Sequence, residues 1–362
     1  MLQHGAPILY AVFLWWFSTG LILLIIGLPR RTHGWSLGGA TVLAALGLAA
    51  FFLSAHDTSV LGAYVAFTSA LLVWGWHEIA FLTGFVTGPR RDRATPDSAG
   101  WPRFREAFGT VAHHEIAILL TALLLAVMVW NAPNAVGFWT FVVLWVMRIS
   151  AKLNVFWGVP NINEEFLPRQ LDFLTSYFRK GPTNGFFPVA VSLATIGAGA
   201  LLVHGFVLEL GPLWTAGLML VGSLLTLAVI EHWFMVLPLK DAALWRWALR
   251  GAHVAALDGD APLRADDRQS WRTSLVGAYD PAGLETVLQD VARGTFGRIA
   301  EVRGVARACS GWVRFDLVGG QPHLISCQPT PQDEAAVVAE GWALDGLRLQ
   351  AAFDGCLTGR AA

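Results

Sequence analysis

Seven apolar stretches, each close to twenty residues long, occupy most of the first 250 residues of the chain. They are Ile8–Leu28, Trp35–Leu53, Val60–Phe85, Val111–Trp130, Ala135–Trp157, Val189–Val207 and Leu213–Leu237. About 20 apolar residues in a helix cross the hydrocarbon core of a bilayer. A lipid-exposed segment must also satisfy its own backbone hydrogen bonds, which a helix does. The stretches therefore predict an all-α polytopic membrane protein with seven transmembrane helices.

Composition and cysteine usage narrow the class further. Only 14% of the 362 residues are charged, whereas soluble proteins have roughly a quarter. The formal net charge of -1 provides no overall basic surface, so we expect no nucleic-acid partner. Three cysteines without CxxC spacing favour neither a zinc site nor a disulfide framework.

Lysine and arginine occur in alternate connections between the apolar stretches. Residues 1–7, 54–59, 131–134 and 208–212 contain neither, and the basic residues of the other connections are Arg30, Arg31, Arg90, Arg91, Arg93, Arg103, Arg105, Arg169, Arg179, Lys180, Lys240, Arg246 and Arg250. Cytoplasmic loops carry the excess of positive charge. The pattern predicts a multi-pass membrane protein with its N-terminus outside and its C-terminus in the cytoplasm.

The distribution of apolar and polar residues also divides the chain into domains. We expect a transmembrane domain over residues 1–250, with a flexible loop at Gly88–Thr110 and an amphipathic interfacial helix near 165–180. A polar linker over residues 251–280 and a small α+β cytoplasmic domain over residues 281–362 should follow. In that domain AGLETVLQDVARG predicts a helix, GWVRFDLVGG and PHLISC predict two paired strands, and another helix is expected near Asp333.

A polar stretch at Trp145–Pro168 stands out in this apolar background. Its polar residues include Arg148, Lys152, Asn154, Asn163, Glu164 and Glu165. Three further His and Glu clusters lie at 77–78, 113–115 and 231–232. At about 1.5 Å per helical residue, all four clusters fall at similar depth near the cytoplasmic face. Because ionisable groups within a membrane normally face a partner or a cavity, we expect one shared polar site.

Two interpretations of this site stay open. A metal site, for example a dinuclear iron or manganese centre, would draw its ligands from His77, Glu78, His114, Glu115, Glu164, Glu231 and His232. The usual Glu-x-x-His and HExxH spacings are absent from the sequence, however. The alternative is an ion-pair network in which Arg148 and Lys152, one helical turn apart, neutralise Glu78, Glu115 or Glu231. His204 is a weaker candidate, as a ligand of a tetrapyrrole magnesium.

Several segments resemble the PuhE family of photosynthetic complex assembly proteins from phototrophic bacteria. They are LWWFSTGLILLIIGLPRRT, WGWHEIAFLTGFVTGP, MRISAKLNVFWGVPNINEEFLP and EHWFMVLPLKDAALWRW, and the similarity extends over residues 8 to about 250. The resemblance implies a role in biogenesis of the photosynthetic apparatus, because genes of this family accompany those for the reaction-centre H subunit and for bacteriochlorophyll synthesis. It also implies that the membrane is the bacterial inner (cytoplasmic or intracytoplasmic) membrane, with the N-terminus in the periplasm. It attaches no reaction to the chain.

The leading hypothesis is therefore an inner-membrane assembly factor for the reaction centre and light-harvesting complex. Its partners would be subunits of that complex or pigment-synthesis enzymes, together with membrane lipid. An alternative is a membrane metal-dependent oxidoreductase, possibly di-iron, acting on a pigment precursor, quinone or lipid. A transporter is less favoured, because transporter sites lie near the midplane of the bilayer. The residues assign no catalytic group.

Overall fold

Two compact units, Met1–Ala252 and His253–Ala362, make up the chain in the computed structural model. The structure describes residues 2–162, 167–208, 210–237, 244–245, 247–248, 269–308, 311–318, 321–328, 335–342 and 344–359. Most of the expected linker, together with Asn163, Glu164 and Glu165, lies outside these ranges.

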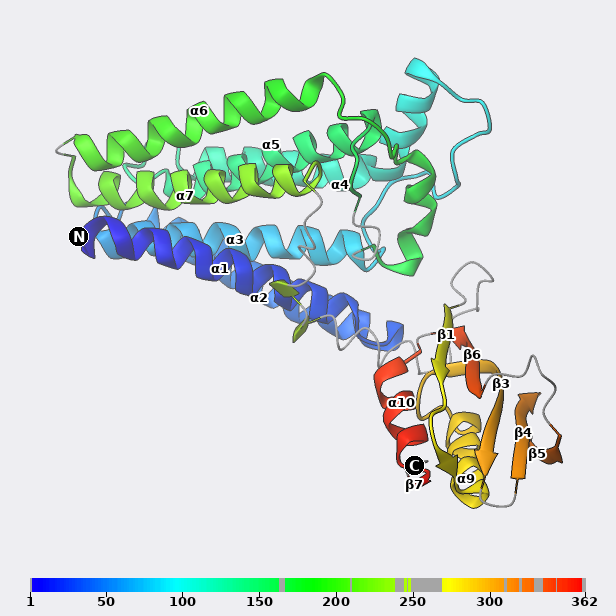
Figure 1. Ribbon diagram of the computed structural model, residues 1–362. Coiled ribbons are helices and arrows are strands. Elements are labelled where there is room, and N and C mark those ends of the chain that lie inside the picture. The colour runs from blue at the N-terminus through cyan, green and yellow to red at the C-terminus, as the bar shows by residue number, and fades with distance from the viewer. Residues whose placement is uncertain are drawn as a thin grey trace. The chain divides into compact units, whose positions relative to one another are not determined.

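The first unit contains seven helices that are long and apolar enough to cross a membrane, as predicted. Its elements are α1 (Leu2–Ile26), η1 (Arg30–Thr32), α2 (His33–Ser54), α3 (Val60–Leu82), α4 (Gly100–Met128), α5 (Val136–Trp157), η3 (Arg169–Tyr177), α6 (Phe186–Val207) and α7 (Pro212–Phe234). The helices lie side by side in one bundle (Figure 1).

Helices α3, α5 and α7 contact one another and form the centre of the bundle. The most apolar windows of α3 and α7 are largely buried, whereas those of α1, α2, α4 and α6 are mostly exposed on the outside. The centre is closely packed around Phe67 and Leu220. At Gly137 of α5, a Cβ atom would collide with the carbonyl oxygen of Ala66 on α3. Small residues at such crossings let membrane helices approach closely.

One asparagine joins the turns at one end of the bundle. The side-chain amide of Asn134, only 1% exposed, donates hydrogen bonds to the carbonyl oxygens of Ser54 (2.9 Å) and Asp57 (3.2 Å). Its Oδ1 accepts from the backbone N–H of Val136 (3.2 Å) at the start of α5. A buried polar side chain here satisfies backbone groups that the ends of α2 and α5 leave unpaired.

Two predictions for the long connections need correction. The segment Gly88–Thr110, expected to be a flexible loop, is helical from Gly100 onward, where α4 begins. The part before Gly100 is tied to η3 by hydrogen bonds, including those from Arg93 to Asp172 (2.6 Å) and from Arg90 to Tyr177 (2.9 Å). Polar composition suggested mobility, but these long-range side-chain contacts hold the segment in place.

The amphipathic segment near 165–180 forms the 3₁₀ helix η3 rather than an α-helix over its described residues. Leu171 and Leu174 are buried against Phe81 at the end of α3. Leu171 and Leu174 therefore pack on the bundle, and the location of the segment at the membrane interface stays a prediction.

The described residues of the second unit form a seven-stranded sheet and two helices. Its elements are β1 (Gln269–Ser274), β2 (Ala278–Tyr279), α9 (Pro281–Ala292), β3 (Arg298–Ala308), β4 (Gly311–Val318), β5 (Gln321–Cys327), β6 (Ala336–Trp342), α10 (Gly346–Asp354) and β7 (Leu357–Gly359). Strand β3 pairs antiparallel with β4 and β6 and parallel with β2. Leu284 and Leu288 of α9 share a core with Phe315 of β4 and Phe353 of α10.

Within this unit, the predicted helix α9 and the predicted β4–β5 hairpin are confirmed. The helix expected near Asp333 is wrong, because residues 336–342 form strand β6, whose side chains alternate between buried and partly exposed. The strands also begin at Gln269, inside the segment assigned to the linker.

Candidate functional site

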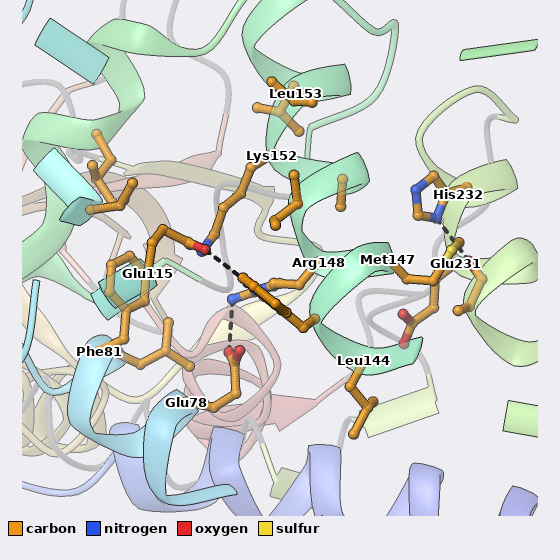
Figure 2. A pocket seen from close by; sticks show the side chains of 18 of the residues that line it. Glu78, Phe81, Glu115, Leu144, Met147, Arg148, Lys152, Leu153, Glu231 and His232 are labelled. Atoms are coloured by element: carbon orange, nitrogen blue, oxygen red, sulfur yellow. Dashed lines mark hydrogen bonds and ion pairs between the residues drawn. The ribbon is translucent and has the colours of Figure 1, made fainter. Parts of the chain in front are cut away.

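A cavity of ≈ 890 Å³ lies in the first unit and is lined mainly by α1, α3, α4, α5 and α7. Most of its wall is apolar, and its charged and imidazole side chains are Glu78, Glu115, Arg148, Lys152, Glu231 and His232. Figure 2 shows that Arg148 and Lys152 of α5 extend toward Glu78 and Glu115, while Glu231 and His232 come from α7 on the other side. All six residues were assigned to the predicted polar site, and in the structure they line the same cavity.

Arg148 on α5 pairs with Glu78 on α3. Its Nη2 donates to Oε2 of the carboxylate at 2.8 Å, and Glu78 is only 7% exposed. The pair makes a single hydrogen bond. Arg148 Nε and Glu78 Oε1 are both buried and have no hydrogen-bond partner among the described residues. Arginine–carboxylate pairs frequently form two parallel hydrogen bonds. We call this pair half open, because it forms only one of the two.

Lys152, one helical turn along α5, pairs with Glu115 on α4. Lys152 Nζ lies 2.5 Å from Glu115 Oε1, and the Trp145 indole N–H donates to the other carboxylate oxygen at 3.2 Å. The ammonium also lies 5.3 Å from the centre of the Phe81 ring. Both carboxylate oxygens of Glu115 thus have donors, and a buried charge requires such pairing.

The α7 side of the cavity is held by hydrogen bonds from two other helices. Glu231 Oε1 accepts from the Trp15 indole N–H of α1 at 2.6 Å. His232 Nδ1 lies 2.8 Å from the carbonyl oxygen of Ala228, and Nε2 lies 2.9 Å from the Ser150 hydroxyl of α5. A carbonyl oxygen only accepts, so Nδ1 carries the proton. In the neutral ring, Nε2 then accepts from Ser150.

His77 and His114 do not line the cavity. They lie behind it, with ring centres 6.4 Å apart. His77 Nε2 is 3.0 Å from the Thr121 hydroxyl of α4, whereas His114 is fully buried, with its ring centre 4.5 Å from that of Phe81. His77 Nδ1 and both ring nitrogens of His114 have no partner within the described part of the chain.

Asn154 does not line the cavity but forms hydrogen bonds that connect α5 to the start of α6. It is fully buried, donates to the carbonyl oxygen of Ser150 (3.0 Å), and accepts from the amide of Asn184 (3.1 Å). Asn184 in turn accepts from the backbone N–H groups of Phe186 and Phe187 at the start of α6. Asn163 and Glu165, also assigned to the site, and Glu164, a candidate ligand, lie outside the described residues.

Sequence reasoning missed three side chains that complete the site, namely Trp15, Trp145 and Ser150. Each donates to a residue that had been predicted to belong to it. Trp and Ser are common in membrane helices, so composition alone does not single them out. Trp145 and Ser150 do lie three residues before and two after Arg148, inside the polar stretch.

Most of the charged side chains on the cavity wall neutralise one another. Arg148 neutralises Glu78, and Lys152 neutralises Glu115, at contact distance. The described residues therefore form ion pairs, which is one of the two interpretations that the sequence left open. Glu231, which was a further candidate for pairing with Arg148 or Lys152, is bound by Trp15. His204 bonds to the carbonyl oxygen of Ala200 on its own helix, α6 (2.7 Å).

Comparison with known proteins places residues 1–256 in a family described as a protein of unknown function (DUF3623). A Rhodobacter capsulatus protein named "uncharacterized 30.4 kDa protein in puhA 5′ region" is 44% identical over 245 residues, which are 67% of this chain and 89% of the relative. No solved structure matches the chain. The family match includes all seven membrane-length helices and both ion pairs.

Metal binding at this site stays a prediction. Across the described ranges, no three His, Cys, Asp or Glu side chains are grouped to hold an ion, and the candidate ligand Glu164 lies outside them. The dinuclear hypothesis predicts iron or manganese in stoichiometric amount with the chain. Elemental analysis of protein purified without chelators checks it, and a metal-free preparation would contradict it.

The Lys152–Glu115 pair should stabilise the bundle. Lys152→Met or Glu115→Gln alone leaves one buried charge without its partner and should lower the free energy of unfolding by about 1–3 kcal/mol. The double variant should lose less than the sum of the two. Thermal unfolding in detergent measures both effects. Arg293→Ala, which removes an exposed pair with Asp290, is the matched control and should change little. Equal stability of all variants would contradict the prediction.

Proposed function

The chain belongs to the DUF3623 family, and we propose from this membership that it is an assembly factor for the photosynthetic reaction centre and light-harvesting complex. The observation that carries the proposal is the name of the R. capsulatus relative, which places its gene in the 5′ region of puhA, a gene of the photosynthetic reaction centre. Neighbouring bacterial genes often serve one process. At 44% identity over 89% of its length, the relative supports a shared role in that process.

The PuhE-like segments favour the same process. They include MRISAKLNVFWGVPNINEEFLP, which contains both cations of the cavity wall. In this proposal the first unit is the part that acts in assembly, because the family match ends at residue 256. Its partners are subunits of the photosynthetic complex or enzymes of pigment synthesis, and lipid surrounds it.

The outer faces of the bundle suit such partners. Leu43 of α2, Leu120 of α4 and Ile196 of α6 are exposed. In a bilayer these side chains contact lipid tails or the helices of another membrane protein. Association between membrane helices depends on packing and hydrogen bonds more than on hydrophobic burial. A partner would therefore bind through complementary shape and hydrogen bonds between helices.

The proposed location is the bacterial inner membrane, with the N-terminus in the periplasm and the second unit in the cytoplasm. Arginines of the α3–α4 connection, including Arg90 and Arg93, lie against η3 of the α5–α6 connection, so positive charge gathers where these two connections meet. Positive loops favour the cytoplasmic side.

This orientation has a direct test in reporter fusions. Alkaline phosphatase is active only in the periplasm, and green fluorescent protein exported through the Sec pathway folds only in the cytoplasm. Fused after Ala362, the fluorescent protein should be bright and the phosphatase inactive, whereas fusions within residues 131–134 should show the reverse. Phosphatase activity at the C-terminus would contradict the proposed orientation.

Deleting the gene in its phototrophic host should lower the near-infrared absorption of assembled reaction-centre and light-harvesting complexes. The wild-type gene supplied in trans should restore it. Arg148→Ala, which leaves Glu78 buried without its cation, should restore it poorly if the cavity takes part in assembly. Arg293→Ala, on the surface of the second unit, should restore it fully.

Membrane spectra normalised to protein measure the effect, with immunoblots to confirm equal levels of each variant. Unchanged absorption in the deletion strain would overturn the proposed function. Full restoration by Arg148→Ala at equal protein level would leave the assembly role in place but remove the cavity from it.

A further inference from the structure

We propose that the cavity binds a molecule from the lipid phase whose polar end is a hydroxyl group, on an isoprenoid alcohol or a hydroquinone. The inference stands on the geometry of the cavity and does not depend on the proposed assembly role. It starts from the half-open pair between Arg148 and Glu78, both of which line the cavity wall.

The open half of this pair consists of one donor and one acceptor. Arg148 Nε–H and Glu78 Oε1 are buried, and neither has a partner among the described residues. Burying polar atoms without partners is unfavourable. Nη2 and Oε2 are already bonded to each other at 2.8 Å, so Nε–H and Oε1 are the donor and the acceptor of this pair that lack a partner among the described residues. A ligand that satisfies both must accept one hydrogen bond and donate another.

A hydroxyl group meets this requirement with a single atom. It has one O–H donor and two acceptor lone pairs, so it can accept from Arg148 Nε–H while donating to Glu78 Oε1. A ketone, ester or quinone oxygen can only accept, and it would leave Glu78 Oε1 without a donor. An ammonium can only donate, and it would leave Arg148 Nε–H without an acceptor.

The rest of the cavity fits an apolar body. Its volume of ≈ 890 Å³ is within the ~300–1,000 Å³ range of small-molecule sites. Trp74, Ile116, Leu144 and Leu224 line it from four different helices, all of membrane-spanning length. Leu144 is labelled in Figure 2 on α5, the helix that carries Arg148. A molecule that reaches this wall between such helices comes from the bilayer.

The charges on the cavity wall favour a ligand whose polar end is neutral. Four ionised side chains of the wall form two neutral pairs, Arg148–Glu78 and Lys152–Glu115. Glu231 lies on the same wall. An anionic phosphate group would bring a further negative charge into a site with no surplus cation among its described side chains, and an unpaired buried charge is strongly unfavourable. Hydroxyl-bearing lipids avoid this cost, and anionic phospholipids do not.

The test compares matched ligands on the purified full-length protein in detergent by isothermal titration calorimetry. The probes are geranylgeraniol and its methyl ether, which lacks the donor, and decylubiquinol and decylubiquinone, with the quinol kept reduced under argon. The alcohol or the quinol should bind about tenfold more tightly than its donor-free counterpart. Which of the two hydroxyl compounds binds more tightly identifies the source of the hydroxyl group.

Two variants locate the effect. Arg148→Lys keeps a cation opposite Glu78 but removes the planar fork and its Nε–H, and it should abolish the preference for the hydroxyl compound. Arg293→Ala, which changes an exposed side chain that does not line the cavity, should retain it. These predictions hold for ligand preference, so a general loss of stability cannot imitate them.

Three results would overturn the proposal. They are equal affinities within both ligand pairs on the wild-type protein, no binding of any probe, and tighter binding of phosphatidylglycerol than of the hydroxyl compounds. The ligand series on the wild-type chain is sufficient for each of them, even if a variant fails to fold.

Discussion

The two cations on α5 are the constraint on which the rest of the membrane unit depends. A charge in the interior of an apolar bundle needs an opposite charge within contact distance. Arg148 reaches α3 and Lys152 reaches α4, so one helix fixes the rotation of two others about their axes. Turning α5 by a single residue, about 100°, would point both cations away from their carboxylates. The packing of α3, α5 and α7 around Phe67 and Leu220 then fills the space that these pairs define.

The sequence predicts that the polar residues of the cavity wall lie near one another, but it does not predict which way each side chain points. Length and hydropathy predicted all seven helices, and counting residues brought Glu78, Glu115 and Arg148 to one level. Within each His–Glu pair, however, neighbouring side chains diverge by about 100°. On α3 and α4, Glu78 and Glu115 line the cavity and His77 and His114 do not, whereas on α7 both Glu231 and His232 line it. Rotation is decided by packing between helices, which single-sequence periodicity in uniformly apolar helices does not contain.

Long-range contacts explain the other differences between prediction and structure. The segment before Gly100 has the composition of a flexible loop, yet Arg93 and Arg90 bind Asp172 and Tyr177, about eighty residues away. The amphipathic spacing of Leu171 and Leu174 suits packing against a membrane surface or against another helix. In the structure both side chains pack against Phe81 at the end of α3. In the second unit, β6 pairs with β1 and β3, whose residues are more than thirty positions away in the sequence. The local sequence near Asp333 does not predict such long-range pairing.

Asn134 has a consequence for the order in which the bundle assembles. Its side chain and backbone donate to the carbonyl oxygens of Ser54, Ala55 and Asp57, all of which belong to the end of α2 and the turn that follows it. These acceptors are in position only after the α2–α3 hairpin has formed. Because chains emerge from the ribosome N-terminus first, we expect the α2–α3 hairpin to form before α5 is complete. The hairpin would then offer preformed acceptors to Asn134, just before the first residue of α5.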